Sequence, residues 1–236
     1  MSIEYPASGS APDPMRRPLW TSLADNIANM IANAIATRRI VPGERIVETT
    51  LADKLGVSRV PIREALKVLH AQGILTGGGH RGYHVSAFDG ETTQQILEVR
   101  LMLESFLLRD ALQNWRAGLE DPAALQGPID EMKRAARAED LPASLQADLD
   151  FHRTIRDAAR NNIVGTLWDT IARHVMIVFN FERYRDKDLK EIAVQHEGFR
   201  DFILAEIAKP GVPEKVEEML EDHFLLIERR RRRKKD

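Results

Sequence analysis

The sequence of 236 residues contains no cysteine, which excludes disulfide scaffolds, thiolate zinc fingers and cysteine nucleophiles. It has no apolar run near the roughly 18 residues that a membrane helix needs, and its start lacks the basic-then-apolar pattern of a secretory signal. Hydrophobic residues make up 43% and charged residues 30% of the chain, a balance typical of globular proteins and not of wholly disordered ones. We therefore expect a cytoplasmic protein with no membrane partner.

Neither sign of charge dominates overall, because the formal net charge is only −2, but the two signs are unevenly distributed. Residues 19–86 carry eight Lys/Arg against five Asp/Glu, whereas residues 87–228 carry 17 Lys/Arg against 28 Asp/Glu. This division favours a basic segment that meets an anionic polymer and an acidic segment that holds cations. Scattered charge on solvated faces is the alternative. The basic run Arg229–Lys235 is either a solvated helix end or a tail that contacts nucleic-acid phosphates.

Helix-type spacing of apolar residues recurs along most of the chain, whereas short strand-like runs occur at one place only. Residues 1–18, rich in Pro, Ser, Gly and Ala, are expected to form a disordered leader. Residues 19–86 predict helices over 19–39, 48–55 and 58–73, followed by a hairpin of short strands at 74–76 and 83–86. After a linker at 87–92, residues 93–236 predict an all-helical bundle of six or seven helices, near 90–115, 123–138, 143–161, 163–184, 188–208 and 213–233. The expected fold class is therefore mainly α.

The segment Leu51–Leu66 has the layout of a helix-turn-helix, with a tight turn at Gly56 and a second helix that begins after Ser58. Arg59 and Arg63 are four residues apart, so both lie opposite the apolar stripe, in the part of a recognition helix that enters the major groove. A guanidinium can bond guanine O6 and N7 or a phosphate, and Ser58 with the first free backbone N–H groups can bind a phosphate. A solvated helix face with two arginines is the alternative.

The strings Ile40–Ile46, Gly56–Leu66, Gly73–Leu75 and Gly82–Val85 closely resemble the winged helix-turn-helix of GntR-family transcription regulators. The resemblance implies a homodimeric regulator, expected to be a repressor, that binds a pseudo-palindromic double-stranded DNA operator. The residues that it implies for DNA binding are Arg45, Ser58, Arg59, Arg63 and the wing-tip pair Arg81 and Gly82. The glycine content of Gly77–His80 departs from the family pattern, and this run is not a phosphate-binding loop because it precedes a strand.

Four residues of the predicted bundle are of types that bind metal ions. Asp148 and His152 are four apart on one predicted helix, so both can project from a single face. His196 and His223 lie among the apolar positions of two further helices. Three imidazoles and one carboxylate suit zinc first, with nickel, manganese or iron as alternatives. Each residue alone also fits a satisfied core histidine or an ordinary helix pair.

The order Asp148, His152, Asn161, His196 and His223 resembles the FadR C-terminal domain, known as FCD, over residues 90–228. In that domain the matching aspartate and three histidines bind a divalent metal ion. The resemblance therefore implies an effector-binding and dimerisation domain in the acidic part of the chain.

Arg100 lies in the string Arg-Leu-Met-Leu-Glu between apolar neighbours, and an arginine held partly inside a bundle needs an anionic partner. In FCD regulators the arginine in this context binds a small organic acid whose other oxygens meet the metal, which implies an effector-binding Arg100. A salt bridge with Glu104, four residues on, is the alternative. Asn161 is expected to cap a helix C-terminus rather than to contact a ligand.

Two other functions stay open. A site of three histidines and one aspartate with open coordination positions could activate water in a metalloenzyme that carries a DNA-binding domain, although the second domain offers no placed general base or nucleophile. Alternatively, the histidine cluster is empty and structural, and another protein controls DNA binding. The expected function is a regulator and not an enzyme, in which residues 86–92 link effector binding to DNA release.

Overall fold

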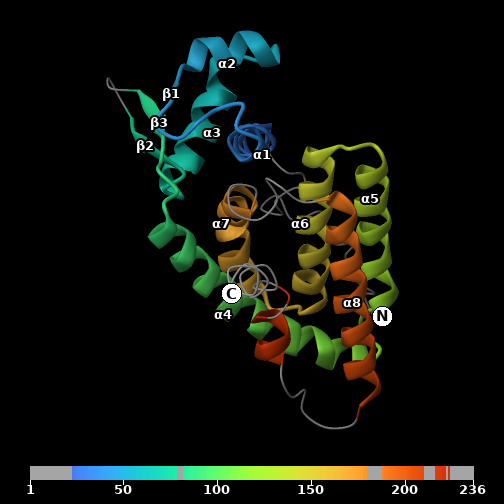
Figure 1. Cartoon of the computed structure of the whole chain (residues 1–236). Helices are drawn as coiled ribbons and strands as arrows, with labels where there is room; N and C mark the ends of the chain where they lie inside the picture. Colours follow the sequence, from blue (N-terminus) through green and yellow to red (C-terminus); the bar gives the residue numbers. More distant parts are fainter. Residues whose placement is uncertain (1–22, 79–81, 180–187, 210–215, 222, 224–236) are drawn as a thin grey trace, which may run out of the picture.

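The computed structural model describes residues 23–78, 82–179, 188–209, 216–221 and 223. It is mainly helical, with a small N-terminal unit of helices and a three-stranded sheet that adjoins a larger helical domain (Figure 1). The fold class expected from the sequence is therefore confirmed. The predicted leader at 1–18, the wing residue Arg81 and the basic run at 229–235 lie outside the described residues.

The N-terminal unit contains the three predicted helices and a sheet with one strand more than predicted. Its elements are α1 (Leu23–Ala36), β1 (Arg45–Ile46), α2 (Glu48–Leu55), α3 (Arg59–Ala71), β2 (Leu75–Gly77) and β3 (Tyr83–Val85). The strands lie in the order β1-β3-β2, and both neighbouring pairs are antiparallel. β1 is two residues long and is held by pairing with Tyr83 and His84. So short a strand shows no alternation in the sequence by which it could be predicted.

The packing of α3 on α1 leaves the opposite face of α3 in solvent. Four residues of α3 are fully buried and form its apolar stripe, namely Ile62, Ala65, Leu66 and Leu69. α2 ends at Gly56, whose φ of 65° is the left-handed conformation that glycine adopts without strain. The chain then turns and begins α3 directly after Ser58. The predicted helix-turn-helix is thus present, and its second helix has a buried and an exposed face.

The larger domain is built from helices α4 (Gly90–Arg116), α5 (Gln126–Arg137), α6 (Leu141–Ala158), α7 (Asn162–Phe179) and α8 (Leu189–Ala208), with a short 3-10 turn η2 (Pro122–Leu125) before α5. Residues 216–221 are also helical. Asp89, Asp140 and Asp188 each accept a hydrogen bond from a first-turn N–H of α4, α6 and α8 and so cap these helices. α6 begins two residues before the predicted 143, because Asp140 caps it and Pro142 stands in the first turn, where no N–H is needed.

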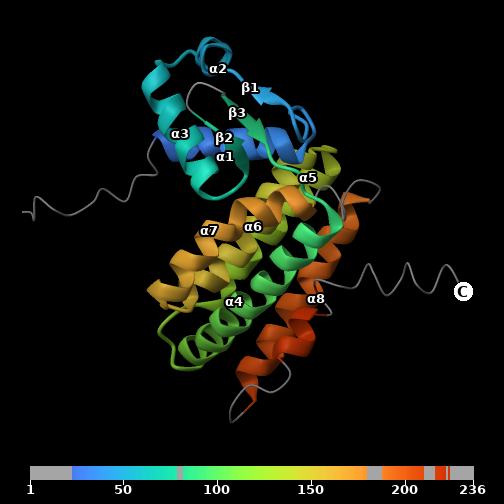
Figure 2. The same cartoon turned by 90° about the vertical axis from the view of Figure 1, so that its left-hand side faces the viewer.

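The helices of the larger domain surround a core that includes Leu107, Phe151, Trp168 and Ile203, all almost completely buried. α4 packs on α6 and α7, and α5 packs on α6 and α8. α7 also packs on α1, so it joins the larger domain to the N-terminal unit (Figures 1 and 2). In Figure 2, α4 crosses the front of the domain with its outer side toward the viewer. Among the described helices, none has the length and apolar character needed to cross a membrane.

Candidate functional site: nucleic-acid interface and metal centre

The exposed face of α3 carries both predicted recognition arginines. The side chains of Arg59 and Arg63 are 58% and 51% exposed, and each has a guanidinium nitrogen near the same Glu48 oxygen, at 3.6 Å and 3.2 Å. Glu48 is the first residue of α2, so this carboxylate holds the two guanidinium groups side by side at the surface. Exposed ion pairs of this kind contribute little free energy. DNA phosphates or base edges can therefore replace Glu48 as the partner at small cost.

The N-terminus of α3 offers two more groups beside the arginines. Ser58 is the N-cap residue, and within the described part of the chain its side chain makes no capping hydrogen bond. Its hydroxyl thus lies uncommitted at the positive end of the helix dipole, where a phosphate is favoured. Val60 is 68% exposed and is suited to contact a thymine methyl group. The sequence analysis missed Val60, although its signal, an apolar residue outside the apolar stripe of α3, was visible.

Arg45 on β1 lies against the backbone of the wing hairpin. A Cβ atom on Gly82 would be 2.9 Å from Arg45 Nε, and Gly82 has a φ of +74°. Across the hairpin, a Cβ atom on Gly77 would be 2.5 Å from the carbonyl oxygen of Gly82. The backbone contact at Gly77 and the positive φ of both residues favour glycine at these two positions. Arg45, Gly82 and the α3 arginines all belong to the N-terminal unit, and Arg81 lies outside the described residues.

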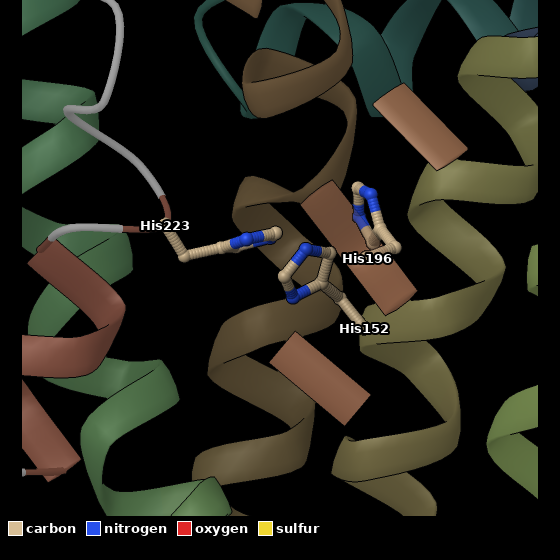
Figure 3. A group of neighbouring side chains, drawn as sticks. All are labelled: His152, His196 and His223. Carbon is tan, nitrogen blue, oxygen red and sulfur yellow. The ribbon is translucent and has the colours of Figure 1, made fainter. Parts of the chain in front are cut away.

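Three buried histidines meet inside the helical domain. His152 comes from α6, His196 from α8, and His223 follows the helical residues 216–221. Figure 3 shows their rings gathered in one place from these separate segments. One ring nitrogen of each residue can be chosen so that these atoms lie within 4.8 Å of one another. The structure thus brings together all three histidines that the sequence analysis selected.

Asp148 belongs to the same cluster. It lies one turn before His152 on α6, and its Oδ1 is 3.1 Å from His196 Nε2. Burial alone would raise the pKa of the Asp148 carboxyl, but its contact with His196 and the charge of Arg100 hold that pKa well below its usual range. The side chain is therefore ionised and can serve as an anionic metal ligand. All four predicted ligand residues lie in one buried cluster.

Two of the three histidines have a hydrogen-bond acceptor beside Nδ1. His152 Nδ1 lies 2.8 Å from Glu104 Oε2, and His196 Nδ1 lies 2.8 Å from the Ile192 carbonyl oxygen. For His152 this contact favours the tautomer with the hydrogen on Nδ1, which leaves the Nε2 lone pair for a metal ion. His196 has an acceptor beside each ring nitrogen, the Ile192 carbonyl at Nδ1 and Asp148 at Nε2. Burial lowers the pKa of His152, although Glu104 opposes the shift. His152 is therefore neutral, as a metal ligand must be.

Glu104 connects the histidine cluster to Arg100. The Arg100 Nε lies 2.7 Å from Glu104 Oε1, and Trp168 Nε1 donates to the same oxygen at 3.0 Å. Burial alone would raise the pKa of Glu104, but Arg100 and His152 lower it to about 2. The salt bridge between Arg100 and Glu104, which the sequence left as the alternative, is thus present. Arg100 still lies next to the histidine cluster, because the Glu104 carboxylate that it pairs with also contacts His152.

The charges of this buried group suit a cation. Arg100 contributes one positive charge, whereas Glu104 and Asp148 contribute two negative charges. An uncompensated buried negative charge is costly, and a bound divalent cation would offset it. Neutral imidazoles and a carboxylate are also the donor types that zinc and other first-row divalent ions prefer. The residues therefore fit the metal ion that the resemblance implies.

α7 contacts both the site and the DNA-binding unit. Near its middle Trp168 donates to Glu104, and further along Arg173 reaches the N-terminal unit. Arg173 donates to Asn29 of α1 at 2.8 Å and to Gln72 at the end of α3 at 3.1 Å. The sequence analysis assigned no role to either residue, because their partners are far away along the chain. α7 thus contacts both parts.

Asn161 has a different role from the one expected. Its Oδ1 accepts a hydrogen bond from the Val164 backbone N–H at 3.1 Å, and its Nδ2 donates to Asp110 at 2.8 Å. It therefore caps the N-terminus of α7, and the expectation of a helix C-cap was wrong. The reason is that α6 ends at Ala158, earlier than its predicted end. Asn161 consequently belongs to the following helix.

Comparison with known proteins identifies both units. The profile described as bacterial regulatory proteins, gntR family, matches residues 23–85, and that of the FCD domain matches residues 95–226. The chain is 28% identical over 203 residues to a probable D-xylose utilization operon transcriptional repressor of Paenarthrobacter nicotinovorans, a match that covers 86% of each protein. It is 27% identical over 156 residues to the gluconate operon transcriptional repressor of Bacillus subtilis, covering 64% of this chain and 63% of that repressor.

A solved structure has the same fold. The structure titled E. coli McbR/YncC superimposes with a TM-score of 0.70 at 19% sequence identity, over 90% of this chain and 100% of that chain. The helix-turn-helix, the convergent buried histidines and the two matching family profiles agree with one another. The chain therefore belongs to the GntR family of bacterial transcription regulators and carries an FCD domain.

Proposed function

We propose that the protein is a homodimeric transcriptional repressor whose affinity for its operator is set by a small organic acid, bound beside a divalent metal ion in the helical domain. One observation carries this proposal. The same chain has exposed arginines, Arg59 and Arg63, at the start of α3 and a buried cluster of Asp148 with three histidines. The names of two relatives, the D-xylose and gluconate operon repressors, support the repressor function.

The DNA-binding domain, residues 19–86, would insert the start of α3 into the major groove. Arg59 and Arg63 would bond base edges or phosphates, and Ser58 would receive a phosphate at the N-terminus of the helix. Arg45, with Arg81 and Gly82, would contact DNA at the wing. A twofold dimer presents two such helices, so the operator would be a pseudo-palindrome with half-sites about one helical turn apart.

The effector domain, residues 93–236, would hold the metal through its four predicted ligands, Asp148, His152, His196 and His223. Zinc is the first candidate, with nickel, manganese or iron as alternatives. When bound, the ion supplies positive charge and open coordination positions for carboxylate oxygens. Arg100 would bind a carboxylate of the organic acid, which must then compete with or add to the contact of Glu104.

The signal would pass to the DNA-binding domain through two connections. The first is the predicted link at 86–92, which includes the start of α4. The second is α7, because Trp168 contacts Glu104 near the metal cluster and Arg173 contacts the end of α3. An acid that prefers one arrangement of these contacts shifts the dimer toward that arrangement. The acid would release DNA if its preferred arrangement separates the two α3 helices from their half-sites.

The test starts from DNA selected out of a random-sequence pool by the purified protein. We expect a pseudo-palindromic site protected over both half-sites, and a thermal-shift screen of carboxylic acids in which hits raise the melting temperature only when metal is present. Hits should also change the affinity for the selected DNA. No enriched sequence would contradict the repressor, and equal hits without metal would contradict the metal-dependent effector site.

A further inference from the structure

We propose that the Ser144 hydroxyl determines which organic acid binds in the helical domain, and that this acid carries a hydroxyl group beyond its carboxylate. The inference rests on the proposed function, because it names the class of acid for the same site. It starts from the burial of Ser144. The residue is fully buried in α6, and among the described residues its Oγ has no hydrogen-bond partner. Native proteins contain few buried hydroxyl groups of this kind, because such a group destabilises the folded state.

Ser144 lies on the same face of α6 as two of the proposed metal ligands. Ser144, Asp148 and His152 are four residues apart, so their side chains follow one another along one side of the helix. Asp148 Oδ1 lies 3.1 Å from His196 Nε2, and therefore this side of α6 faces the histidine cluster. Ser144 is one turn before Asp148, about 6 Å along the helix at 1.5 Å per residue.

Two turns of α4 pass beside the turns of α6 that hold the proposed ligands. Glu104 Oε2 lies 2.8 Å from His152 Nδ1. One turn earlier on both helices, the charge of Arg100 helps to lower the pKa of Asp148. The two helices therefore run in the same direction here, and at each of these two turns a polar group of α6 has a polar group of α4 beside it.

The turn of α6 that holds Ser144 has no such polar neighbour. On α4, the residue one turn before Arg100 is Ile96, which is partly buried and packs against the core. On α8, the residue one turn before His196 is Ile192, which is fully buried. Both neighbouring helices thus carry an apolar side chain at the turn that corresponds to Ser144. This explains why the Ser144 hydroxyl has no partner.

A hydroxyl group on the acid is the partner that this environment favours. A serine hydroxyl can both donate and accept a hydrogen bond, so it matches a hydroxyl group on the ligand. A second charged group would be costly between two isoleucines, whereas the carbon chain of the acid can pack on them. One turn of about 6 Å, less a hydrogen bond of about 2.8 Å, leaves room for about two or three carbon atoms between the carboxylate and the hydroxyl.

The test compares acids that differ only in whether the chain ends in a hydroxyl or in a methyl group of similar size. The probes are 3-hydroxypropanoate against butyrate and 4-hydroxybutyrate against pentanoate. Isothermal titration calorimetry on the full-length, zinc-loaded protein measures their dissociation constants. We expect at least one hydroxy acid to bind the wild type about tenfold more tightly than its methyl counterpart, because only the hydroxy acid supplies the partner that Ser144 lacks.

The variant Ser144→Ala should lose this preference, so that the two members of each pair bind within about twofold of each other. It should fold, because it removes a buried hydroxyl without a partner, and its melting temperature without acid should equal or exceed that of the wild type. Ser105→Ala is the matched control. Among the described residues Ser105 Oγ is also buried without a partner, but Ser105 lines an outer groove of α4 with Met102 and Arg109. This variant should keep the wild-type preference.

The outcomes separate this inference from the proposed function. Equal binding of hydroxy and methyl acids to the wild type, or a preference that persists in Ser144→Ala, would overturn the role of Ser144. So would a lack of binding by all four probes when other carboxylic acids raise the melting temperature only with metal present. In each of these cases the proposed effector site would stand. If no carboxylic acid binds the metal-loaded protein, both the role of Ser144 and the proposed effector site are overturned.

Discussion

Glu104 Oε2 lies 2.8 Å from His152 Nδ1, and the other oxygen of the same carboxylate lies 2.7 Å from Arg100 Nε. A single side chain of α4 thus contacts both a proposed metal ligand and the proposed effector-binding arginine. Carboxylate–histidine contacts of this kind orient the imidazole and raise its basicity as a ligand. In the proposed site, Glu104 would therefore orient His152 toward the metal ion and would add negative charge close to the bound organic acid.

The substitution Glu104→Gln keeps the size of this side chain and removes its charge. We expect the metal affinity to fall by about 10- to 100-fold, because His152 loses the partner that orients and polarises it. The measurement is competition with a chromophoric zinc chelator. Glu91→Gln, at the exposed start of the same helix, is the control and should bind metal as the wild type does. Equal affinity in the Glu104 variant would show that this carboxylate does not support the metal.

Arg63→Ala should abolish specific operator binding while the protein stays folded, dimeric and metal-containing. Each well-placed guanidinium contact to a base contributes about 1–3 kcal/mol of discrimination, and in a dimer the loss occurs twice. Fluorescence anisotropy on the selected DNA measures the effect. Lys67→Ala, one turn further along α3 and 56% exposed, is the matched control and should lose at most a modest, salt-dependent share of the affinity. Unchanged specific binding by Arg63→Ala would remove α3 as the recognition helix.

Gly82→Ala should weaken DNA binding through Arg45. The added methyl group would lie 2.9 Å from Arg45 Nε, so the Arg45 side chain must move, and the backbone φ of +74° is one that alanine rarely adopts. Gly127→Ala is the control, because a Cβ atom there meets nothing within 4 Å and the position is inside α5. Operator affinity should fall in the first variant only. An equal affinity in both would show that the wing geometry does not position Arg45 on DNA.

Arg173→Ala should loosen the contact between the two domains. It removes charge-assisted hydrogen bonds to Asn29 and Gln72, which contribute about 1–3 kcal/mol when shielded from water. We expect faster amide hydrogen exchange in α1 and at the end of α3, with the histidine cluster still able to bind metal. Arg160→Ala, whose side chain pairs with Glu120 at the surface, should leave these rates unchanged. Wild-type exchange rates in the Arg173 variant would contradict the role of α7 as a connection.

His174 gives the interface between the domains a pH dependence. Burial lowers its pKa below the ordinary 6.5, backbone contacts with Gln72 and Thr170 oppose the shift, and the charge of Arg173 adds to it. The unfolded chain therefore binds a proton more readily, and the free energy of unfolding falls as the pH drops through about 6.5 toward the folded-state pKa. In His174→Gln this contribution should vanish, so urea unfolding at pH 8 and pH 5.5 should differ less than in the wild type. An identical pH dependence in the two proteins would contradict this prediction.

Much of the fold could be predicted from the sequence because its signals are local. The apolar stripe of α3 and the breaker at Gly56 specify the helix-turn-helix without reference to any distant residue. β1 could not be predicted, since two residues show no period and the strand exists only through pairing with β3. The start of α6 differs from the prediction for a local reason, because Asp140 caps the helix two residues before the start that the apolar pattern indicates.

Some residues of the candidate site could also be predicted from local spacing, whereas others could not. His152 and Asp148 share one helix face, so their proximity follows from a spacing of four residues. That His196 and His223 join them could be inferred only through the family resemblance, because three separate segments must pack together. Trp168 and Arg173 were missed since nothing in their local sequence shows which distant residues they contact.

In the proposed function, the buried cluster of Asp148 and three histidines controls the affinity of α3 for DNA. The most direct measurement is the operator affinity of metal-loaded protein, titrated with an organic acid selected in the thermal-shift screen, for the wild type and for Arg100→Ala. We predict that the acid changes the wild-type affinity at least tenfold and that the change is lost in the variant and after metal removal. If the acid changes the operator affinity equally in the Arg100→Ala variant and in the metal-free protein, the proposed effector site is contradicted.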